Sequence, residues 1–531
     1  MTAALRVEER ATPYLVAPLL TDHLDTFASS PEGFKRLREL VFELAAQGGL
    51  IESTVPIAPV RLGDYVELVM GQAPPGNACN KAGVGTVFVK TGEFGPLYPE
   101  VREWTTKPLK FAKRGDVLIC VVGATVGKLN LAIDCAIGRS VAAIRPCPEL
   151  NTTYLYYTLM PFTLKLREKS RGSAQGVIGK EELSAVSLRI PDLAEQSRIV
   201  AKVEELMALI DALEAKVGAG ETARGKLLDA RLAALADSPD ADATADAWAQ
   251  LAPHFDLLLQ TPADVDRLQQ TLLQLAVKGR LVPQNPKDEP AAELLKRIRA
   301  EKDRLIAEGK IKRDKPLPSI VEVELPFAVP LGWQWAILGD VVLSSEAGWS
   351  PSCENMPREN GKWGVLKVSA VSWGEFLDEE NKALPSHLEV RPEHEVMPGD
   401  FLLSRANTAE LVARSVVAWN PKSRLMLSDK IIRLHIATGA DKTYLNLFNN
   451  SSYARTHYVA NASGTSASMK NVSREVVLSL PVPVPPATEQ SRIVAAVASL
   501  TALCDSLRER LAARRELSAK LAAALTEAAL Q

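Results

Sequence analysis

The chain has 531 residues, of which 47% are hydrophobic and 24% are charged, and its formal net charge is -2. This composition lies in the globular range and excludes a disordered, collagen-like or highly charged tail protein. A balance so close to neutral also argues against a uniformly basic nucleic-acid coat, although the sum can hide a local basic face.

Residues 1–59 are predicted to be an N-terminal helical region. The apolar residues Phe34, Leu37, Val41 and Leu44 recur at helical spacing, which is typical of one buried helix face. The first residues show no basic region followed by a long apolar run. No stretch of the chain reaches the roughly 18 apolar residues of a membrane span. We therefore expect neither an export signal nor a membrane segment.

Residues 60–190 are predicted to form a strand-rich α/β domain, because short apolar runs such as 117–122 are bounded by Gly, Asp, Asn and Pro. They contain 17 Lys and Arg against 11 Asp and Glu, an excess of +6. This excess is compatible with a plain solvated surface or with a basic face that binds phosphates.

The segment from Gly123 to Leu129 resembles a phosphate-binding P-loop. It has three residues between its glycines instead of four, and Leu129 replaces the Ser or Thr that would hold magnesium. No nucleotide site is expected there.

Residues 191–235 are predicted to form a long coiled-coil helix. Apolar residues recur every 3.5 positions, which is typical of a coiled-coil seam, whereas a plain amphipathic helix on a globular core is the alternative. Asp192 is a plausible N-terminal cap, and Gly218 and Gly220 are expected to shorten or bend the helix. The predicted seam consists of Ile199, Val203, Leu206, Ile210, Leu213 and Val217.

Residues 236–262 contain five Asp and no Lys or Arg, which favours a solvated acidic linker. Residues 263–332 are predicted to be a helical region that repeats the N-terminal helix. At an offset of 231, Val265, Leu268, Leu272 and Leu275 correspond to Phe34, Leu37, Val41 and Leu44.

Residues 333–484 are predicted to be a second strand-rich domain, because short landmarks of 60–190 return in the same order. Leu62-Gly63-Asp64 returns as Leu338-Gly339-Asp340, Gly115-Asp116 as Gly399-Asp400, and Tyr154-Leu155 as Tyr444-Leu445. Residues 401–480 hold 10 basic against 4 acidic residues, whereas residues 340–400 hold 5 against 12. Trp349, Trp363 and Trp373 are expected to pack in the core or in loops.

Residues 485–531 are predicted to be a second coiled-coil helix. The run from Glu195 to Val200 returns unchanged as Glu489 to Val494, at an offset of 294. Thr488 is a plausible N-terminal cap. The predicted seam consists of Ile493, Val497, Leu500, Cys504, Leu507 and Leu511.

The chain is therefore an internal repeat. We predict an α/β (α+β) protein with two strand-rich globular domains separated by long antiparallel coiled-coil helices and related by a pseudo-twofold repeat.

Catalytic motifs are absent from the sequence. No Asp-Pro-Pro-Tyr or Asn-Pro-Pro-Phe motif for adenine methylation occurs, and the six histidines form no metal-spaced pair and accompany no recognisable Ser or Cys nucleophile. The six cysteines are scattered without a Cys-x-x-Cys pair, which favours buried thiols in a reducing, cytoplasmic protein. Neither enzymatic activity nor a bound metal is expected in this chain.

Three sets of residues resemble the specificity subunit of type I restriction-modification enzymes. They are the repeated Pro-x-x-x-Glu-Gln-x-Arg-Ile-Val before each heptad helix, the stretch LAVKGRLVPQNPKDEP at 275–290, and PLGWQW at 330–335 before Leu338-Gly339-Asp340. The resemblance covers essentially the whole chain.

The resemblance implies a non-catalytic reader of double-stranded DNA, in which each variable domain is a target recognition domain for one half of a split sequence. Two modification subunits, which bind S-adenosylmethionine and methylate adenine, would dock on it. Two restriction subunits, with ATP, magnesium, translocase and nuclease activity, would complete the complex. No cofactor would belong to this chain itself. The alternatives are a coiled-coil scaffold whose repeated domains bind protein and, against the missing motifs, a self-contained methyltransferase.

Candidate DNA contacts are Arg, Lys, Asn, Gln, Ser and Thr in Gly-rich loops that follow strands, because phosphate contacts position a domain and base-edge contacts specify the sequence. A structural or solvent role is the alternative for each residue. In the first domain the candidates are Lys90, Thr91, Lys128, Arg139, Ser173, Gln175 and Lys180. In the second they are Lys367, Ser369, Arg405, Asn407, Thr408, Thr465, Ser466, Lys470 and Asn471.

Overall fold

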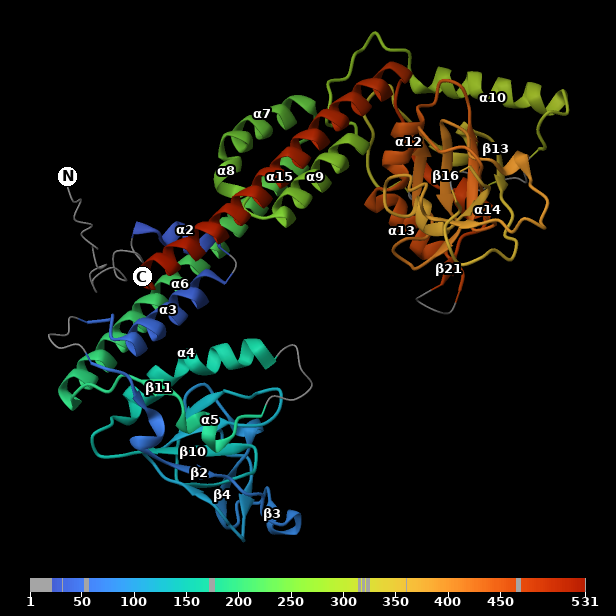
Figure 1. Ribbon diagram of the computed structural model, residues 1–531. Coiled ribbons are helices and arrows are strands. Elements are labelled where there is room, and N and C mark those ends of the chain that lie inside the picture. Colours follow the sequence, from blue (N-terminus) through green and yellow to red (C-terminus); the bar gives the residue numbers. More distant parts are fainter. Residues whose placement is uncertain are drawn as a thin grey trace, which may run out of the picture. The chain divides into compact units, whose positions relative to one another are not determined.

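The computed structural model describes residues 22–30, 32–51, 57–170, 177–313, 317, 320, 325–359, 361–464 and 469–530 (Figure 1). The chain divides into two compact units, residues 1–223 with 512–531 and residues 224–511. Each unit contains one strand-rich domain and parts of two long helices, α6 (Leu193–Ala236) and α15 (Ala487–Leu530).

The first strand-rich domain contains two sheets. The four-stranded antiparallel sheet has the order β2 (Val66–Met70), β10 (Val141–Pro146), β7 (Val117–Cys120), β8 (Leu129–Leu131). The second sheet has the order β3 (Cys79–Asn80), β5 (Trp104–Thr105), β4 (Thr86–Val89), β9 (Cys135–Ile137), β6 (Phe111–Ala112), and its β4 and β9 are parallel. A further pair joins β1 (Val60–Arg61) to β11 (Ser187–Leu188). The helical elements that position loops are η3 (Thr91–Glu93), α4 (Thr152–Ser170) and α5 (Lys180–Ser184).

The second strand-rich domain repeats this topology. Its four-stranded sheet has the order β13 (Val342–Ala347), β20 (Ile431–Ile436), β16 (Asp400–Ser404), β18 (Ser415–Ala418). A smaller sheet has the order β15 (Asn381–Ala383), β14 (Gly364–Leu366), β19 (Leu425–Met426), and its β14 and β19 are parallel. Two further pairs are β12 (Gln334–Ile337) with β22 (Pro481–Val484) and β17 (Ala406–Asn407) with β21 (Lys470–Asn471). The helical elements are α11 (Leu338–Val341), η6 (Val368–Val371), α12 (Lys442–Asn449), α13 (Ser452–Asn461) and α14 (Arg474–Leu478).

The two domains thus share one order of paired elements, although their sequences share only short landmarks. In both four-stranded sheets the last strand in the sequence pairs with the first and with the second, counted in chain order within the sheet. The predicted α/β class and internal repeat are therefore confirmed.

The Gly-Asp landmark is explained by a buried ion pair. Gly115 and Gly399 adopt positive φ values of 100° and 83°, a conformation that favours glycine. The carboxylate of Asp116 accepts from the Lys113 backbone N–H at 2.8 Å and pairs with Arg145 at 3.0 Å. In the second domain Asp400 accepts from the backbone of Met397 at 2.9 Å and pairs with Arg433 at 3.2 Å. In each domain the landmark aspartate therefore ties the two middle strands of the four-stranded sheet together at one end.

The repeated Glu-Gln pair is explained by a buried amide that joins each long helix to its strand-rich domain. The side-chain oxygen of Gln196 accepts from the Asn151 backbone N–H at 2.7 Å, and its Nε2 donates to the carbonyls of Glu149 and Pro191 at 2.8 and 2.7 Å. Gln490 accepts from the Asp441 backbone N–H at 2.7 Å and donates to the Pro485 carbonyl at 2.9 Å.

Each glutamine therefore fastens the first turn of α6 or α15 to the start of α4 or α12, because Asn151 and Asp441 cap those helices. A buried tyrosine reinforces each junction. The hydroxyl of Tyr154 donates to the Arg189 carbonyl and that of Tyr444 to the Pro483 carbonyl, both at 2.6 Å.

In the first unit, the seam of α6 is buried against α2 (Leu24–Ser29) and α3 (Gly33–Gln47). Ile199, Val203, Leu206 and Ile210 belong to a core that also contains Ala522 of α15, whereas Leu213 is half-buried. The predicted face of α3 lies in the same core, with Leu37, Val41 and Leu44 buried and Phe34 half-buried.

In the second unit, the end of α6 and the middle of α15 share a core with α9 (Pro262–Val277). Cys504, Leu507 and Leu511 pack there with Leu228, Leu232 and Leu235 of α6 and with Val265, Leu268, Leu272 and Leu275 of α9, and Leu500 is half-buried beside them. Ile493 and Val497 instead join the core of the strand-rich domain. The start of α6 thus packs with the end of α15 in the first unit, and the end of α6 packs with the middle of α15 in the second.

Two expectations about the helices were wrong and one was confirmed. Gly218 and Gly220 do not break α6, which continues for 44 residues, because the roughly 1 kcal/mol that each glycine costs is small beside the buried seam. Asp192 does cap its helix, accepting from the Glu195 N–H at 2.8 Å. Thr488, however, lies inside the first turn of α15, since that helix begins at Ala487 and Pro486 occupies the position equivalent to Asp192.

The acidic segment 236–262 is folded rather than a solvated linker. It forms α7 (Ala241–Leu251), a 3-10 turn (Ala252–His254) and α8 (Phe255–Leu258). Leu251, Leu258 and Leu259 are buried in the core that contains α9 and α15, and Figure 1 shows α7 and α8 beside these helices. The aspartates are compatible with this fold because they lie at caps and on the solvent face: Asp240 caps α7, accepting from the Ala243 N–H at 2.9 Å.

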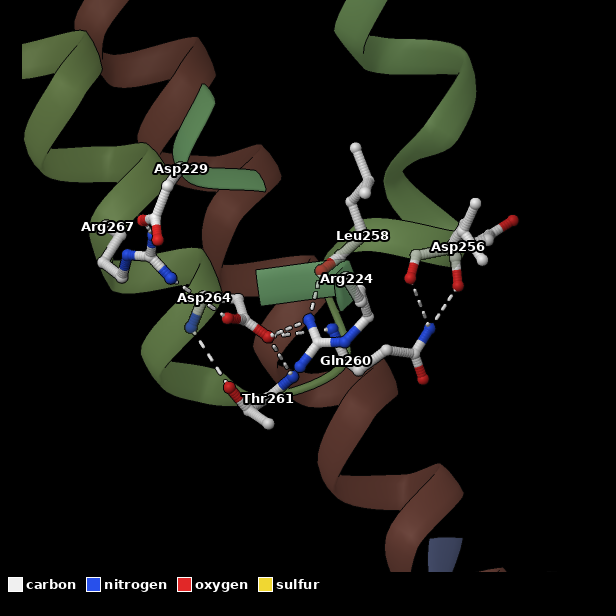
Figure 2. Close-up of polar contacts among 9 residues, drawn as sticks. Arg224, Asp229, Asp256, Leu258, Gln260, Thr261, Asp264 and Arg267 are labelled. Atoms are coloured by element: carbon white, nitrogen blue, oxygen red, sulfur yellow. Dashed lines mark hydrogen bonds and ion pairs between the residues drawn. The ribbon is translucent and has the colours of Figure 1, made fainter. Parts of the chain in front are cut away.

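The start of α9 is tied to α6 through Asp264, which is buried (Figure 2). Its Oδ2 accepts from the backbone N–H groups of Gln260 and Thr261 at 3.2 and 3.0 Å and from Arg224 Nη1 at 2.8 Å. Beside it, Arg267 of α9 pairs with Asp229 of α6. These ionic contacts fix where α9 begins along α6. Beyond α9, the second unit also contains a charged helix, α10 (Ala291–Ala307).

Replacing Gln490 by Ala should lower the free energy of unfolding by about 1 to 3 kcal/mol, because the N–H of Asp441 loses its partner in a buried position. Urea denaturation of the full chain measures this change. The control is Ser491→Ala on the exposed side of the same turn, which should stay within about 0.5 kcal/mol. Equal stabilities of the two variants would contradict the role given to Gln490.

Candidate nucleic-acid interface

The loops that carry the candidate residues of the first domain meet at one edge of its sheets. The Gly138 N–H donates to the Val89 carbonyl at 2.9 Å, which brings the turn before β10 next to the end of β4. The Ile178 N–H donates to the Val121 carbonyl at 2.8 Å, which adds the segment leading to α5. This first edge therefore gathers Lys90, Lys128, Arg139 and Lys180.

Two of these cations have structural partners. Lys90 pairs with Glu103, while its backbone N–H donates to Glu93 at 2.9 Å in a capping box. The hydrogen bond that Lys90 donates to Glu103 raises the pKa of the Lys90 ammonium. The ammonium of Lys128 donates to the Phe94 carbonyl. Thr91, at the start of η3, is half-buried.

Arg139 and Lys180 are exposed at the same edge. Among the described residues, neither forms a side-chain ion pair. They are the cations of the first edge that remain available to a ligand.

The second domain gathers its candidates at the end of β16. The Arg405 N–H donates to the Lys430 carbonyl at 2.7 Å, and Asn407 lies directly opposite Lys470 in the β17–β21 pair. Asn407 Nδ2 also donates to Ser372 Oγ at 2.9 Å, which adds the turn after η6. We call these residues the second edge.

Several side chains of the second edge are held within the protein. Lys367 pairs with Glu380 at 3.6 Å, and Ser369 Oγ donates to the same carboxylate at 2.6 Å. The hydrogen bond from Ser369, followed by the attraction of Lys367, lowers the pKa of the Glu380 carboxyl. The ammonium of Lys470 donates to the Gly464 carbonyl at 2.7 Å. Thr408 and Asn471 are half-buried, and Arg405 is exposed.

Two features of the second edge were not predicted. Lys430 lies in the turn before β20, with its side chain 53% exposed, and pairs with Asp429 at 3.5 Å. Its signal in the sequence was a basic residue in a Ser-Asp-Lys turn before the last strand. Trp373 was expected to pack in the protein, but it is 63% exposed. Trp349 and Trp363 are half-buried as expected, and Arg391 lies over the Trp349 ring.

Four candidates, Ser173, Gln175, Thr465 and Ser466, lie outside the described residues. The segment that resembles a P-loop closes the hairpin between β7 and β8: its Gly127 N–H donates to the Cys120 carbonyl at 2.8 Å, and a strand follows it where a P-loop requires a helix.

All six cysteines are free thiols. Cys120, Cys135 and Cys504 are buried and the other three are half-buried. Burial raises the pKa of the Cys135 thiol to about 12. In the part of the chain that the structure describes, no group of three or more His, Cys, Asp or Glu residues is arranged to hold a metal ion. The described helices include none long and apolar enough to cross a membrane.

Residues 55–218 match the family model of the type I restriction modification DNA specificity domain. The match begins just before the first strand-rich domain and includes the first half of α6. This part of the chain therefore resembles a DNA specificity domain.

The relatives extend the likeness beyond that domain. The chain is 40% identical to the EcoEI type I restriction enzyme specificity subunit of Escherichia coli, over 72% of this chain and 65% of the relative. It is 33% identical to the EcoAI specificity subunit of Escherichia coli, over 64% of this chain and 57% of the relative. The match thus spans less than two thirds of either relative.

A solved structure of the HsdS subunit from Thermoanaerobacter tengcongensis is 31% identical, over 38% of this chain and 51% of that chain, with a TM-score of 0.31. The chain is therefore similar to type I restriction-modification specificity subunits over the larger part of its length.

Replacing Glu103 by Gln should make Lys90 react faster with an amine-specific acylating reagent at mildly alkaline pH. The loss of the carboxylate lowers the pKa of Lys90, and the reaction rate follows the neutral amine fraction, roughly tenfold per unit of pKa. Mass spectrometry of labelled peptides gives the rates, with the exposed Lys180 as the internal control. An unchanged Lys90 rate would contradict the assigned pairing.

Proposed function

We propose that this chain is the DNA sequence-recognition subunit of a type I restriction-modification complex. Each strand-rich domain reads one half of a bipartite target, and the chain itself catalyses no step. The observation that carries the proposal is the duplication of one domain with polar and basic loops at the same end of its strands, in a chain similar to specificity subunits.

The distribution of charge supports this proposal. At the first edge, Arg139 and Lys180 are free to meet phosphates, and at the second edge Arg405 and Lys430 are exposed. Phosphate contacts from such residues position a domain on the duplex. Asn471, half-buried at the second edge, supplies an amide group of the kind that reads base edges in the major groove, whereas the amide of Asn407 holds Ser372 and Thr408.

The long helices support a fixed spacing between half-sites. Each has 44 residues, about 66 Å at 1.5 Å per residue, which is about two turns of duplex DNA. The boundary between the two compact units falls inside both helices. We infer that their length sets the number of base pairs between the half-sites.

We further propose that two modification subunits and two restriction subunits dock on this chain in the cytoplasm, away from membranes. S-adenosylmethionine, ATP and magnesium would then belong to those partners. Methylation of adenine in the target would be performed by the modification subunits while this chain holds them on the DNA.

The proposal predicts salt-sensitive, sequence-specific binding of the full chain to duplex DNA. Selection from a random duplex library should yield two short motifs separated by a fixed gap, and binding should weaken linearly on a plot of log affinity against log salt. A coiled-coil scaffold that binds protein would show no salt-sensitive binding, and this result would sink the proposal.

Arg405→Ala should weaken binding at every salt concentration tested and reduce the salt slope by about 0.9, the value for one lost phosphate contact. Lys310→Ala removes the same charge from an exposed position after α10 and should leave the slope unchanged. Identical slopes for the two variants would remove Arg405 from the interface.

Deleting one heptad from each long helix, residues 216–222 and 509–515, should change the preferred gap and leave both half-site sequences unchanged. Seven residues correspond to about 10 Å of helix, the length of about three base pairs, and a whole heptad keeps the seam in phase. Library selection with the shortened chain measures the gap; an unchanged gap would show that the helices do not set it.

A further inference from the structure

Trp373 presents a large apolar surface from an anchored turn of the second edge. The indole is 63% exposed, while the preceding Ser372 is buried. Ser372 Oγ donates to the Val368 carbonyl at 2.6 Å and accepts from Asn407 Nδ2 at 2.9 Å. Gly374, the residue after Trp373, has a φ of 91°, which completes a tight turn. The backbone on both sides is therefore fixed while the ring remains in water.

A second exposed apolar side chain belongs to the residue before the strand partner of Asn407. Met469 is 61% exposed and directly precedes Lys470, whose Cα is the partner of Asn407 in the β17–β21 pair. Large apolar groups exposed together beside polar groups mark interaction sites. Trp373, next to Ser372, and Met469, next to Lys470, thus each adjoin a residue that neighbours Asn407.

The surroundings of this pair favour a polyanion. Arg405 and Lys430 are linked by the backbone hydrogen bond between their segments, and Lys470 is adjacent to Met469. The carboxylates nearby are already paired, Asp429 with Lys430 and Glu380 with Lys367. An apolar pair rimmed by cations matches the faces of bases bordered by phosphates.

The first domain has no tryptophan at the corresponding turn. Its Gly92-Glu93-Phe94 corresponds to Gly374-Glu375-Phe376, so the half-buried Thr91 occupies the place of Trp373. There Glu93 closes a capping box on Lys90 instead. The turn follows β4 in the first domain and β14 in the second, and each of these strands has a parallel partner, β9 or β19.

We propose that Trp373, supported by Met469, forms an apolar contact with a base step of the second half-site. The first domain, with Thr91 at this position, does not make the same contact with the first half-site. This inference rests on the proposed DNA-recognition function. Aromatic stacking on bases and apolar wedges between base steps are both known modes of contact, and either one makes Trp373 a specificity-determining residue of the second domain.

The test compares Trp373→Ala, Trp373→Phe and the control Trp419→Ala in the full chain. Trp419 is similarly exposed, at 55%, but it follows β18 next to Gly399, at the opposite end of β16. Affinities are measured for three duplexes from the library selection: the complete target, one with the second half-site scrambled and one with the first half-site scrambled.

Trp373→Ala should bind the complete target about tenfold more weakly or worse. Its deficit should persist when the first half-site is scrambled and vanish when the second is scrambled. Trp373→Phe should retain most of the affinity, and Trp419→Ala should match the wild type. All variants should keep the wild-type melting temperature, because both rings are largely in water.

Wild-type affinity of Trp373→Ala for the complete target would overturn this inference and leave the proposed function intact. So would a loss of the same size on all three duplexes. If Trp373→Ala bound DNA normally but lost a co-purifying protein, the surface would be a protein interface and the inference would be wrong. Absence of specific binding by the wild type would instead refute the proposed function.

Discussion

The buried amide contact between each long helix and its strand-rich domain is the constraint on which the architecture depends. Gln196 and Gln490 satisfy the backbone at the start of α4 and α12, and each does so from the first turn of its long helix. A rigid helix can fix the position of a loop in a domain only if the junction between the helix and that domain does not rotate. Because both junctions use the same hydrogen bond, each domain is fastened to its own helix in the same way.

The electrostatics follow from this arrangement. The net charge of -2 hides local surfaces, because many carboxylates are used in structure. Asp116, Asp264 and Asp400 are held by arginines, and Glu103 and Glu380 by lysines. What remains at the edges is a small number of free cations. DNA binding of the proposed kind depends on where the cations lie rather than on their total number.

Much of the fold could be predicted because repetition and period are properties of the sequence itself. The six-residue run at Glu195 and Glu489 and the spacing from Ile199 to Ile210 required no three-dimensional knowledge. The helix at 241–251 was missed because counting aspartates ignored the helical spacing of Ala241, Thr244 and Leu251, which are buried. The roles of Lys90 and Lys128 were missed because their partners, Glu103 and the Phe94 carbonyl, are brought together only by the fold. Exposure of Trp373 likewise follows from a turn fixed by Asn407, 34 residues away in the chain, a contact that no local pattern reveals.

The central claim is that each strand-rich domain reads its own half-site. It is tested most directly by a chain in which the second domain, 333–484, also replaces the first, 60–190, while both long helices are kept. If each domain reads one half-site, library selection should recover the second half-site motif twice, with the gap of the wild type. Recovery of the original two-part target, or loss of both motifs in a chain that remains folded, would contradict the account.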